Sequence, residues 1–98
     1  MTETLPTQEQ VDRVARDLAP DVVRIRVMER EDWAGDMALY FRVTLSDDAS
    51  HTDRLGEVAQ LVRAKLTEEL RLDDMDHHPY VRFRSESEQA KLQDPLWA

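Results

Sequence analysis

The chain has 98 residues, of which 41% are hydrophobic and 35% are charged, and its formal net charge is −8. This composition predicts one small folded domain over residues 1–98 and excludes a disordered segment. Because the chain has no cysteine, a disulfide framework and thiolate metal ligands are excluded. The sequence has neither a signal-peptide pattern nor an apolar stretch of membrane-spanning length, so we expect a cytoplasmic protein without a membrane partner.

The first half of the chain predicts a helix followed by a β-hairpin. Thr7 and Gln10 have the spacing of a capping box, and Pro20 ends the helix. The apolar residues between them follow one helical stripe: Val11, Val14, Ala15 and Leu18. Residues 21–30 then alternate, with Val23, Ile25 and Val27 on one side, which predicts a half-buried strand. Residues 31–36 form the expected turn, with Gly35 at positive φ, before a second strand.

The second half predicts a long helix, a third strand and a short final helix. The polar break at residues 46–50 offers N-caps for the long helix. Its apolar stripe consists of Leu55, Val58, Ala59, Val62, Leu66 and Leu70. After a polar linker, residues 80–84 alternate as a strand, and the capping box of Ser85 and Glu88 begins a helix over residues 86–92.

This order, α-β-β-α-β plus a short C-terminal helix in the tail 85–98, predicts an α+β two-layer sandwich. Two amphipathic helices cover one face of a three-stranded sheet, and the other face stays open. The third strand can pair with either the first or the second strand.

The outward positions of the three strands carry arginine and tyrosine. They are Arg24, Arg26, Tyr40, Arg42, Tyr80, Arg82 and Arg84. These residue types are enriched at protein interfaces, so we predict a partner-binding face, with Trp33 and Trp97 as anchors. Two plainer interpretations remain: the face is an ordinary solvated one, or the C-terminal tail folds back and covers the arginines.

Chain direction predicts an acidic rim at the hairpin end of the sheet. It would gather Glu29, Glu31, Asp32, Asp36, Asp73, Asp74 and Asp76, with His77 and His78 beside them. This rim is an alternative partner-binding site. It is also where a cation-binding site or a metal-dependent enzyme would have to lie, with His77 and His78 as weak metal candidates. The plainer interpretation is a pair of solvated loops.

Motifs for catalysis are absent from the sequence. Residues 46–53 contain serine, histidine and aspartate, but neighbours in one loop rarely form a catalytic triad. Neither of the two glycines belongs to a G-x-S-x-G or phosphate-binding pattern. We therefore expect a non-enzymatic protein with no catalytic residue, no cofactor and no resident metal.

The C-terminal stretch resembles the ending of a family of short, uncharacterised bacterial proteins. The matching pattern is Y-x-R-F-R-S-x-S-E-Q-A from Tyr80 to Ala90, followed by D-P-L-W from Asp94 to Trp97. Residues 31–36 and 44–49 resemble the same family. Its members are often encoded beside HEPN-type helical proteins, a class that includes RNase toxins. The resemblance implies a role as partner or antitoxin of such a neighbour.

The element order is also similar to that of KH-type ribosome-binding factors and of the ferredoxin-like cytosolic domains of cation-efflux proteins, although the KH G-x-x-G loop is missing. We therefore predict a protein-interaction module that binds another protein or a second copy of itself. The alternatives are a KH-like RNA-binding protein that uses the arginine and tyrosine face, and a metal-dependent enzyme or cation-binding domain at the acidic end.

Overall fold

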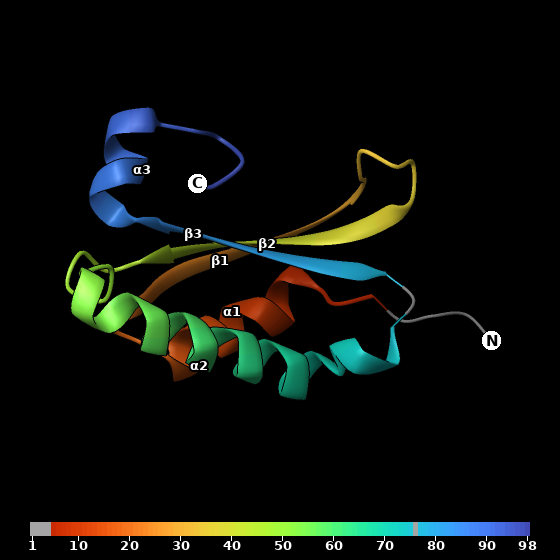
Figure 1. Cartoon of the computed structure of the whole chain (residues 1–98), viewed down its shortest axis with the longest axis horizontal. Coiled ribbons are helices and arrows are strands. Elements are labelled where there is room, and N and C mark those ends of the chain that lie inside the picture. Colours follow the sequence, from red (N-terminus) through yellow and green to blue (C-terminus); the bar gives the residue numbers. More distant parts are fainter. Residues whose placement is uncertain (1–4, 76) are drawn as a thin grey trace.

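The computed structural model describes residues 5–75 and 77–98. Its elements are α1 (Gln8–Asp17), β1 (Val22–Glu31), β2 (Met37–Leu45), α2 (Thr52–Leu70), a 3-10 turn η1 (Leu72–Asp74), β3 (His78–Ser85) and α3 (Glu86–Leu92). Figure 1 shows α1 and α2 on one side of the sheet, and α3 with the end of the chain on the other side. The predicted α+β order is confirmed.

The sheet has the strand order β1-β2-β3. β1 and β2 are antiparallel, as expected for a hairpin, and β2 and β3 are parallel. The parallel pairing follows from α2, which carries the chain back along the sheet so that β3 starts at the same end as β2. The partner of the third strand, which the sequence left open, is therefore β2. β3 lies at an edge of the sheet, and Pro79 is its second residue, a position at which a strand tolerates proline.

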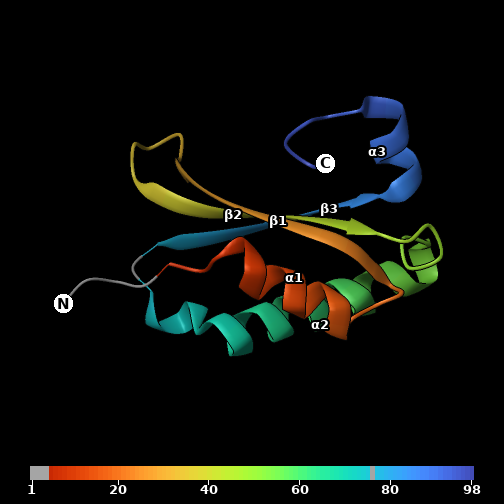
Figure 2. The same ribbon diagram turned by 180° about the vertical axis from the view of Figure 1, so that it is seen from behind.

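The core lies between the sheet and the pair α1 and α2, as Figure 2 shows from behind. Leu55, at the start of the predicted α2 stripe, is 37% exposed. The later part of that stripe and the α1 stripe are buried there, with Val11 and Val14 from α1 and Val62 and Leu66 from α2. Phe41 of β2 is fully buried between them. Burying each such side chain contributes about 1.5–3 kcal/mol, so these stripes explain why the helices lie against this face. No helix in the described part of the chain is long and apolar enough to cross a bilayer.

Two local predictions are wrong. Val23 is 39% exposed, and Val22 is buried in its place. A register shift between Val22 and Arg24 inserts an extra residue in β1, which reverses the side to which the strand start points. The N-cap of α2 is His51, which makes no side-chain capping bond. Ser46 instead accepts from the Ala49 N–H at 3.1 Å and closes the preceding turn.

Candidate functional site

The strand register arranges the outward side chains in rows across the three strands. Arg26, Arg42 and Arg82 align as one row, which we call the arginine row. Met28, Tyr40 and Tyr80 align as the next row toward the hairpin, the tyrosine row. Arg24, Thr44 and Arg84 align on the other side of the arginine row. Successive rows on one face of a sheet are about 7 Å apart, so the face is an ordered surface.

The end of the face away from the hairpin is covered by the C-terminal cap, which we define as α3 and residues 93–98. The Trp97 ring is only 6% exposed. The Arg84 guanidinium lies 4.2 Å from the centre of that ring. Arg24 donates from Nε to the Trp97 carbonyl oxygen at 3.0 Å, and Arg26 donates to the Ala98 oxygen. Arg24 and Arg84 therefore contact the chain's own tail. Trp97, which we predicted as an anchor for a partner, is instead buried against the chain itself.

Capping and side-chain bonds fix α3 at this position. The predicted capping box is present: Ser85 accepts from Glu88 N–H, and Glu88 accepts from Ser85 N–H. Ser87 donates from both its backbone N–H and its hydroxyl to Asp47 in the β2–α2 loop. These hydrogen bonds to the carboxylate lower the pKa of Asp47 below its usual value of 3.8. The loop residue Asp47 thus has a structural role in which it ties the cap to the body.

The tyrosine row is ordered by ring contacts. The Tyr40 and Tyr80 rings are stacked, with centres 5.0 Å apart and planes 12° apart. His78 meets the Tyr80 ring edge-on at 4.6 Å. The Arg42 guanidinium lies 5.7 Å from the Tyr40 ring centre. Burial, and secondarily the positive charge of Arg30, lowers the pKa of Arg42 below its usual value.

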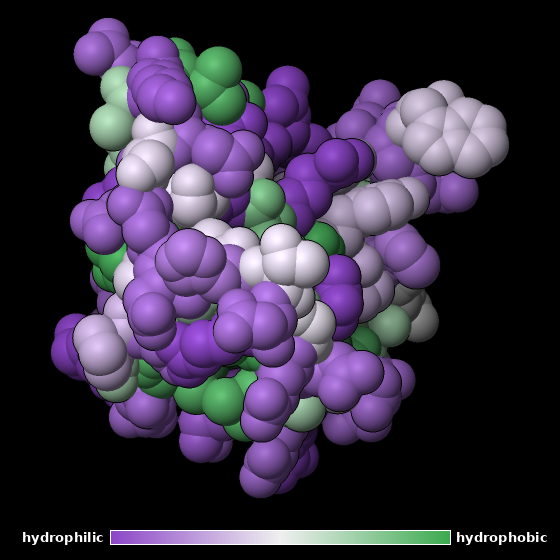
Figure 3. Space-filling model, turned by 60° about the vertical axis from the view of Figure 1, so that its left-hand side comes forward, coloured by the Kyte–Doolittle hydropathy of each residue, from purple (hydrophilic) through white to green (hydrophobic). Residues whose placement is uncertain are grey.

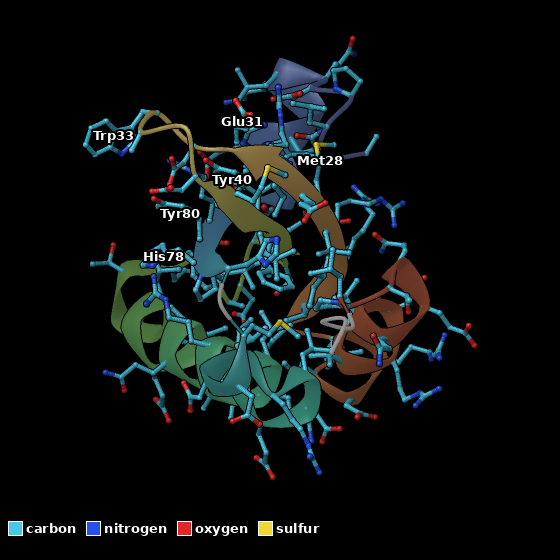
Figure 4. The ribbon with its side chains drawn as sticks, turned by 90° about the vertical axis from the view of Figure 1, so that its right-hand side faces the viewer. Met28, Glu31, Trp33, Tyr40, His78 and Tyr80 are labelled. Atoms are coloured by element: carbon cyan, nitrogen blue, oxygen red, sulfur yellow. The ribbon has the colours of Figure 1, made fainter. Side chains whose placement is uncertain are left out.

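The hairpin tip carries an exposed tryptophan on a rigid turn. Asp32 Oδ1 accepts from the N–H groups of Ala34 at 2.9 Å and Asp36 at 3.0 Å. Gly35 has φ of 87°, as its sequence position predicted. The Trp33 side chain is 94% exposed. Figure 3 shows the hairpin projecting from a largely hydrophilic body, and Figure 4 shows Trp33 pointing outward from its tip.

Between the tip and the tyrosine row lies an open hollow of about 560 Å³, which we call the hairpin hollow. Its lining residues are Asp32, Trp33, Ala34, Asp36, Met37, His77, His78 and Tyr80. Figure 4 shows Trp33, Tyr80 and His78 on the same side of the molecule. Burial, the Asp32 charge and a hydrogen bond to Asp32 all raise the pKa of Tyr80, so its hydroxyl stays protonated at neutral pH.

The structure brings only part of the predicted acidic rim to this hollow. Asp32 and Asp36 line it, and Glu31 is exposed at the end of β1. Asp73 and Asp74 lie in η1, and Asp74 lines a separate depression with Gln10. Figure 1 shows η1 and the hairpin at the same end of the molecule, as chain direction predicted, but η1 continues the helix layer while the hairpin belongs to the sheet layer. Asp76 lies outside the described residues.

The two histidines contact different groups. His77 Nε2 lies 2.6 Å from Glu29 Oε2, whereas His78 packs on Tyr80. Within residues 5–75 and 77–98, no group of three or more His, Asp or Glu side chains is arranged to hold a metal ion.

Sequence reasoning missed two residues of this face. Met37 and Arg30 were not assigned to it, yet Met37 lines the hollow and Arg30 aligns with Ala38 and His78 in the row nearest the hairpin. The signal for Arg30 was available, because it continues the outward phase of Arg24, Arg26 and Met28.

No family model and no curated protein matches this sequence. Two solved structures are similar in fold. A variant of MamM superposes with a TM-score of 0.51 at 12% identity, over 81% of this chain and 95% of that one. A variant of the MamM CTD gives a TM-score of 0.45 at 14% identity, over 79% and 94% of the two chains. The first similarity spans most of both chains and supports the α+β architecture.

Proposed function

We propose that this chain is a non-enzymatic protein-interaction module that binds its partner with the hairpin half of the open sheet face. The observation that carries the proposal is Trp33, which is 94% exposed on a turn held by Asp32. Tryptophan is strongly buried on average, so an almost fully exposed ring offers a large apolar area that a partner can bury. Tryptophan, tyrosine and arginine are also the residues that dominate binding energy at protein interfaces.

The surface around Trp33 supports the same proposal. We define the binding face by six residues: Trp33, Tyr40, Arg42, His78, Tyr80 and Arg82. Its tyrosines are already stacked and its strands are hydrogen-bonded, so little conformational entropy is lost when a partner binds. The residues that contact or form the C-terminal cap are left out of this face: Arg24, Arg26, Arg84 and Trp97.

A capture experiment tests the proposal. The wild-type chain, Trp33→Ala and the control Leu61→Ala would each be used as bait in extracts of the native host, with nuclease present. Leu61 is also an exposed apolar residue, at 54%, but it lies on α2 in the helix layer. We expect a protein retained by the wild type and by Leu61→Ala to be lost with Trp33→Ala. Retention that does not depend on Trp33 would contradict the proposal.

In the more specific version of this proposal, the partner is an RNase toxin of the HEPN type and the chain acts as its antitoxin. The resemblance of residues 80–97 and the net charge of −8 support it, since an acidic protein can occlude an RNA-binding site by charge complementarity. Where a HEPN-type protein encoded beside this chain arrests growth, co-expression of this chain should relieve the arrest, and Trp33→Ala should abolish the relief. Growth arrest that the wild-type chain does not relieve would contradict this version.

The arginine row favours a second candidate function, single-stranded RNA binding. Arg42 and Arg82 of this row lie side by side next to two stacked tyrosines, and such groups can contact phosphates and bases. This candidate predicts binding to an RNA oligonucleotide that weakens steeply with salt and is lost in Arg82→Glu. Unchanged binding after that charge reversal would exclude it.

A further inference from the structure

We infer that the hairpin hollow receives an arginine side chain of the protein partner, between the ring of Trp33 and the edge of the tyrosine row. This inference rests on the proposed interaction function and names the chemistry that the hollow recognises. It starts from the shape of the site, which is an open hollow of about 560 Å³ with aromatic walls at a protruding tip.

The walls of the hollow favour a flat cation. Trp33 and Tyr80 line it, and the faces of aromatic rings attract positive charge. Trp33 is 94% exposed, so its ring face is open to an incoming group. Tyr40, by contrast, already has the Arg42 guanidinium of its own chain 5.7 Å from its ring centre. The contact between Arg42 and Tyr40 is thus an example, within this chain, of an arginine beside an aromatic ring of the same face.

The charges around the hollow favour the same ligand. Asp32 and Asp36 line it, and Arg30 does not, since it lies two strands away from His78 in the row nearest the hairpin. Arg42 and Arg82 align on the far side of the tyrosine row. The hollow is therefore acidic although the middle of the face is basic. Both charges act on the pKa of the Tyr80 hydroxyl. Asp32 raises this pKa, Arg82 lowers it, and the effect of Asp32 is the larger.

Guanidinium fits these walls better than ammonium does. It is planar and stacks on an indole, and its several N–H groups can reach a carboxylate such as Asp36 from the stacked position. A lysine ammonium is a compact, strongly hydrated charge that gains less from the ring face.

The test uses the full chain labelled with ¹⁵N and a short glycine peptide that carries one central arginine. The two tryptophans give two indole N–H signals, and Trp97 serves as the internal reference because the C-terminal cap buries it. We expect the Trp33 signal to move progressively with added arginine peptide while the Trp97 signal stays fixed. The matching lysine peptide should bind more weakly, and the citrulline peptide, which keeps the shape and loses the charge, should not move the signal.

A pair of charge variants separates the hollow from general attraction to an acidic protein. Asp36→Asn should weaken the arginine peptide about threefold, and Glu57→Gln, on the exposed side of α2, should leave it unchanged. Asp36 is chosen because Asp32 closes the turn. Equal effects of the two variants, or an equal response to citrulline, would overturn the inference.

The two proposals fail in different ways. If Trp33→Ala loses a captured partner while the arginine peptide leaves the Trp33 signal unmoved, the interaction function stands and the guanidinium inference falls. If the peptide binds the hollow but no captured protein depends on Trp33, the interaction function falls and the hollow remains a guanidinium site.

Discussion

The two ends of the open sheet face carry the two tryptophans of the chain, and their environments are opposite. Trp97 is 6% exposed beneath Arg84 in the C-terminal cap, whereas Trp33 is 94% exposed at the hairpin tip. Both ends are rich in arginine or aromatic side chains, so composition does not distinguish them. The difference is that one end is covered by the chain's own tail and the other end is left uncovered.

This contrast indicates which surface residues serve the fold and which are available to a partner. Arg24, Arg26 and Arg84 contact the tail through hydrogen bonds or a ring face. Arg82 is exposed, and Arg42 contacts Met28 and Tyr40 of its own face. Substitutions at the two ends should therefore change different measured quantities: the stability of the chain at one end and binding at the other.

The largest effect should come from Trp97→Ala. Removing a buried tryptophan from a packed site costs about 3 kcal/mol, so the free energy of unfolding should fall by that amount. Trp33→Ala should change it by less than about 0.5 kcal/mol, because the ring makes few contacts. Urea unfolding followed by circular dichroism measures both variants. Equal losses would show that the two ends do not differ as described.

Thr44→Val should act in the opposite direction at the covered end. The Thr44 side chain is 1% exposed, and its Oγ1 has no hydrogen-bond partner among the described residues. Because a buried hydroxyl without a partner is destabilising, its removal should raise the free energy of unfolding by about 1 kcal/mol. A loss of stability in the same urea experiment would indicate that the hydroxyl does have a partner.

Gly35→Ala tests the rigid turn at the uncovered end. Gly35 has φ of 87°, and no atom lies within 4 Å of an added Cβ, so the cost is that of the backbone alone. We expect a loss of about 1 kcal/mol in thermal or urea unfolding, together with weaker Trp33-dependent binding. The control is Gly56→Ala, which should stabilise α2 by a similar amount because alanine favours helix.

The smallest expected effect is a pH dependence of the free energy of unfolding, which arises at the covered end of the sheet face. Hydrogen bonds from Ser87 lower the folded-state pKa of Asp47 below 3.8. This contribution to stability is present above the unfolded pKa and is lost as pH falls through the folded value. Ser87→Ala should therefore be less stable than the wild type near neutral pH, and the difference should vanish in strong acid. Ser50→Ala, whose hydroxyl donates to a backbone carbonyl, should show no such dependence.

Local patterns were enough to predict most elements. The capping boxes at Thr7 and Ser85 are both formed as predicted, and the apolar stripe from Val58 to Leu70 is buried. The errors lie where tertiary geometry overrides local pattern. The bulge near Val22 exchanges two valines between the sides of β1, which strand periodicity cannot show. The predicted acidic residues are divided between the two layers, because the hairpin extends the sheet and η1 extends α2.

The sequence by itself determined the helices, the strands, the turn glycine and the side of each strand that carries arginine and tyrosine. These features depend on periodicity and on bonds between residues a few positions apart, which are local. Only the tertiary structure decided that β3 pairs with β2, that rows of arginine and tyrosine align, and that Trp97 packs against the sheet face while Trp33 stays exposed. Those outcomes depend on contacts between residues distant along the chain, such as Arg24 with Trp97, and no local pattern specifies them.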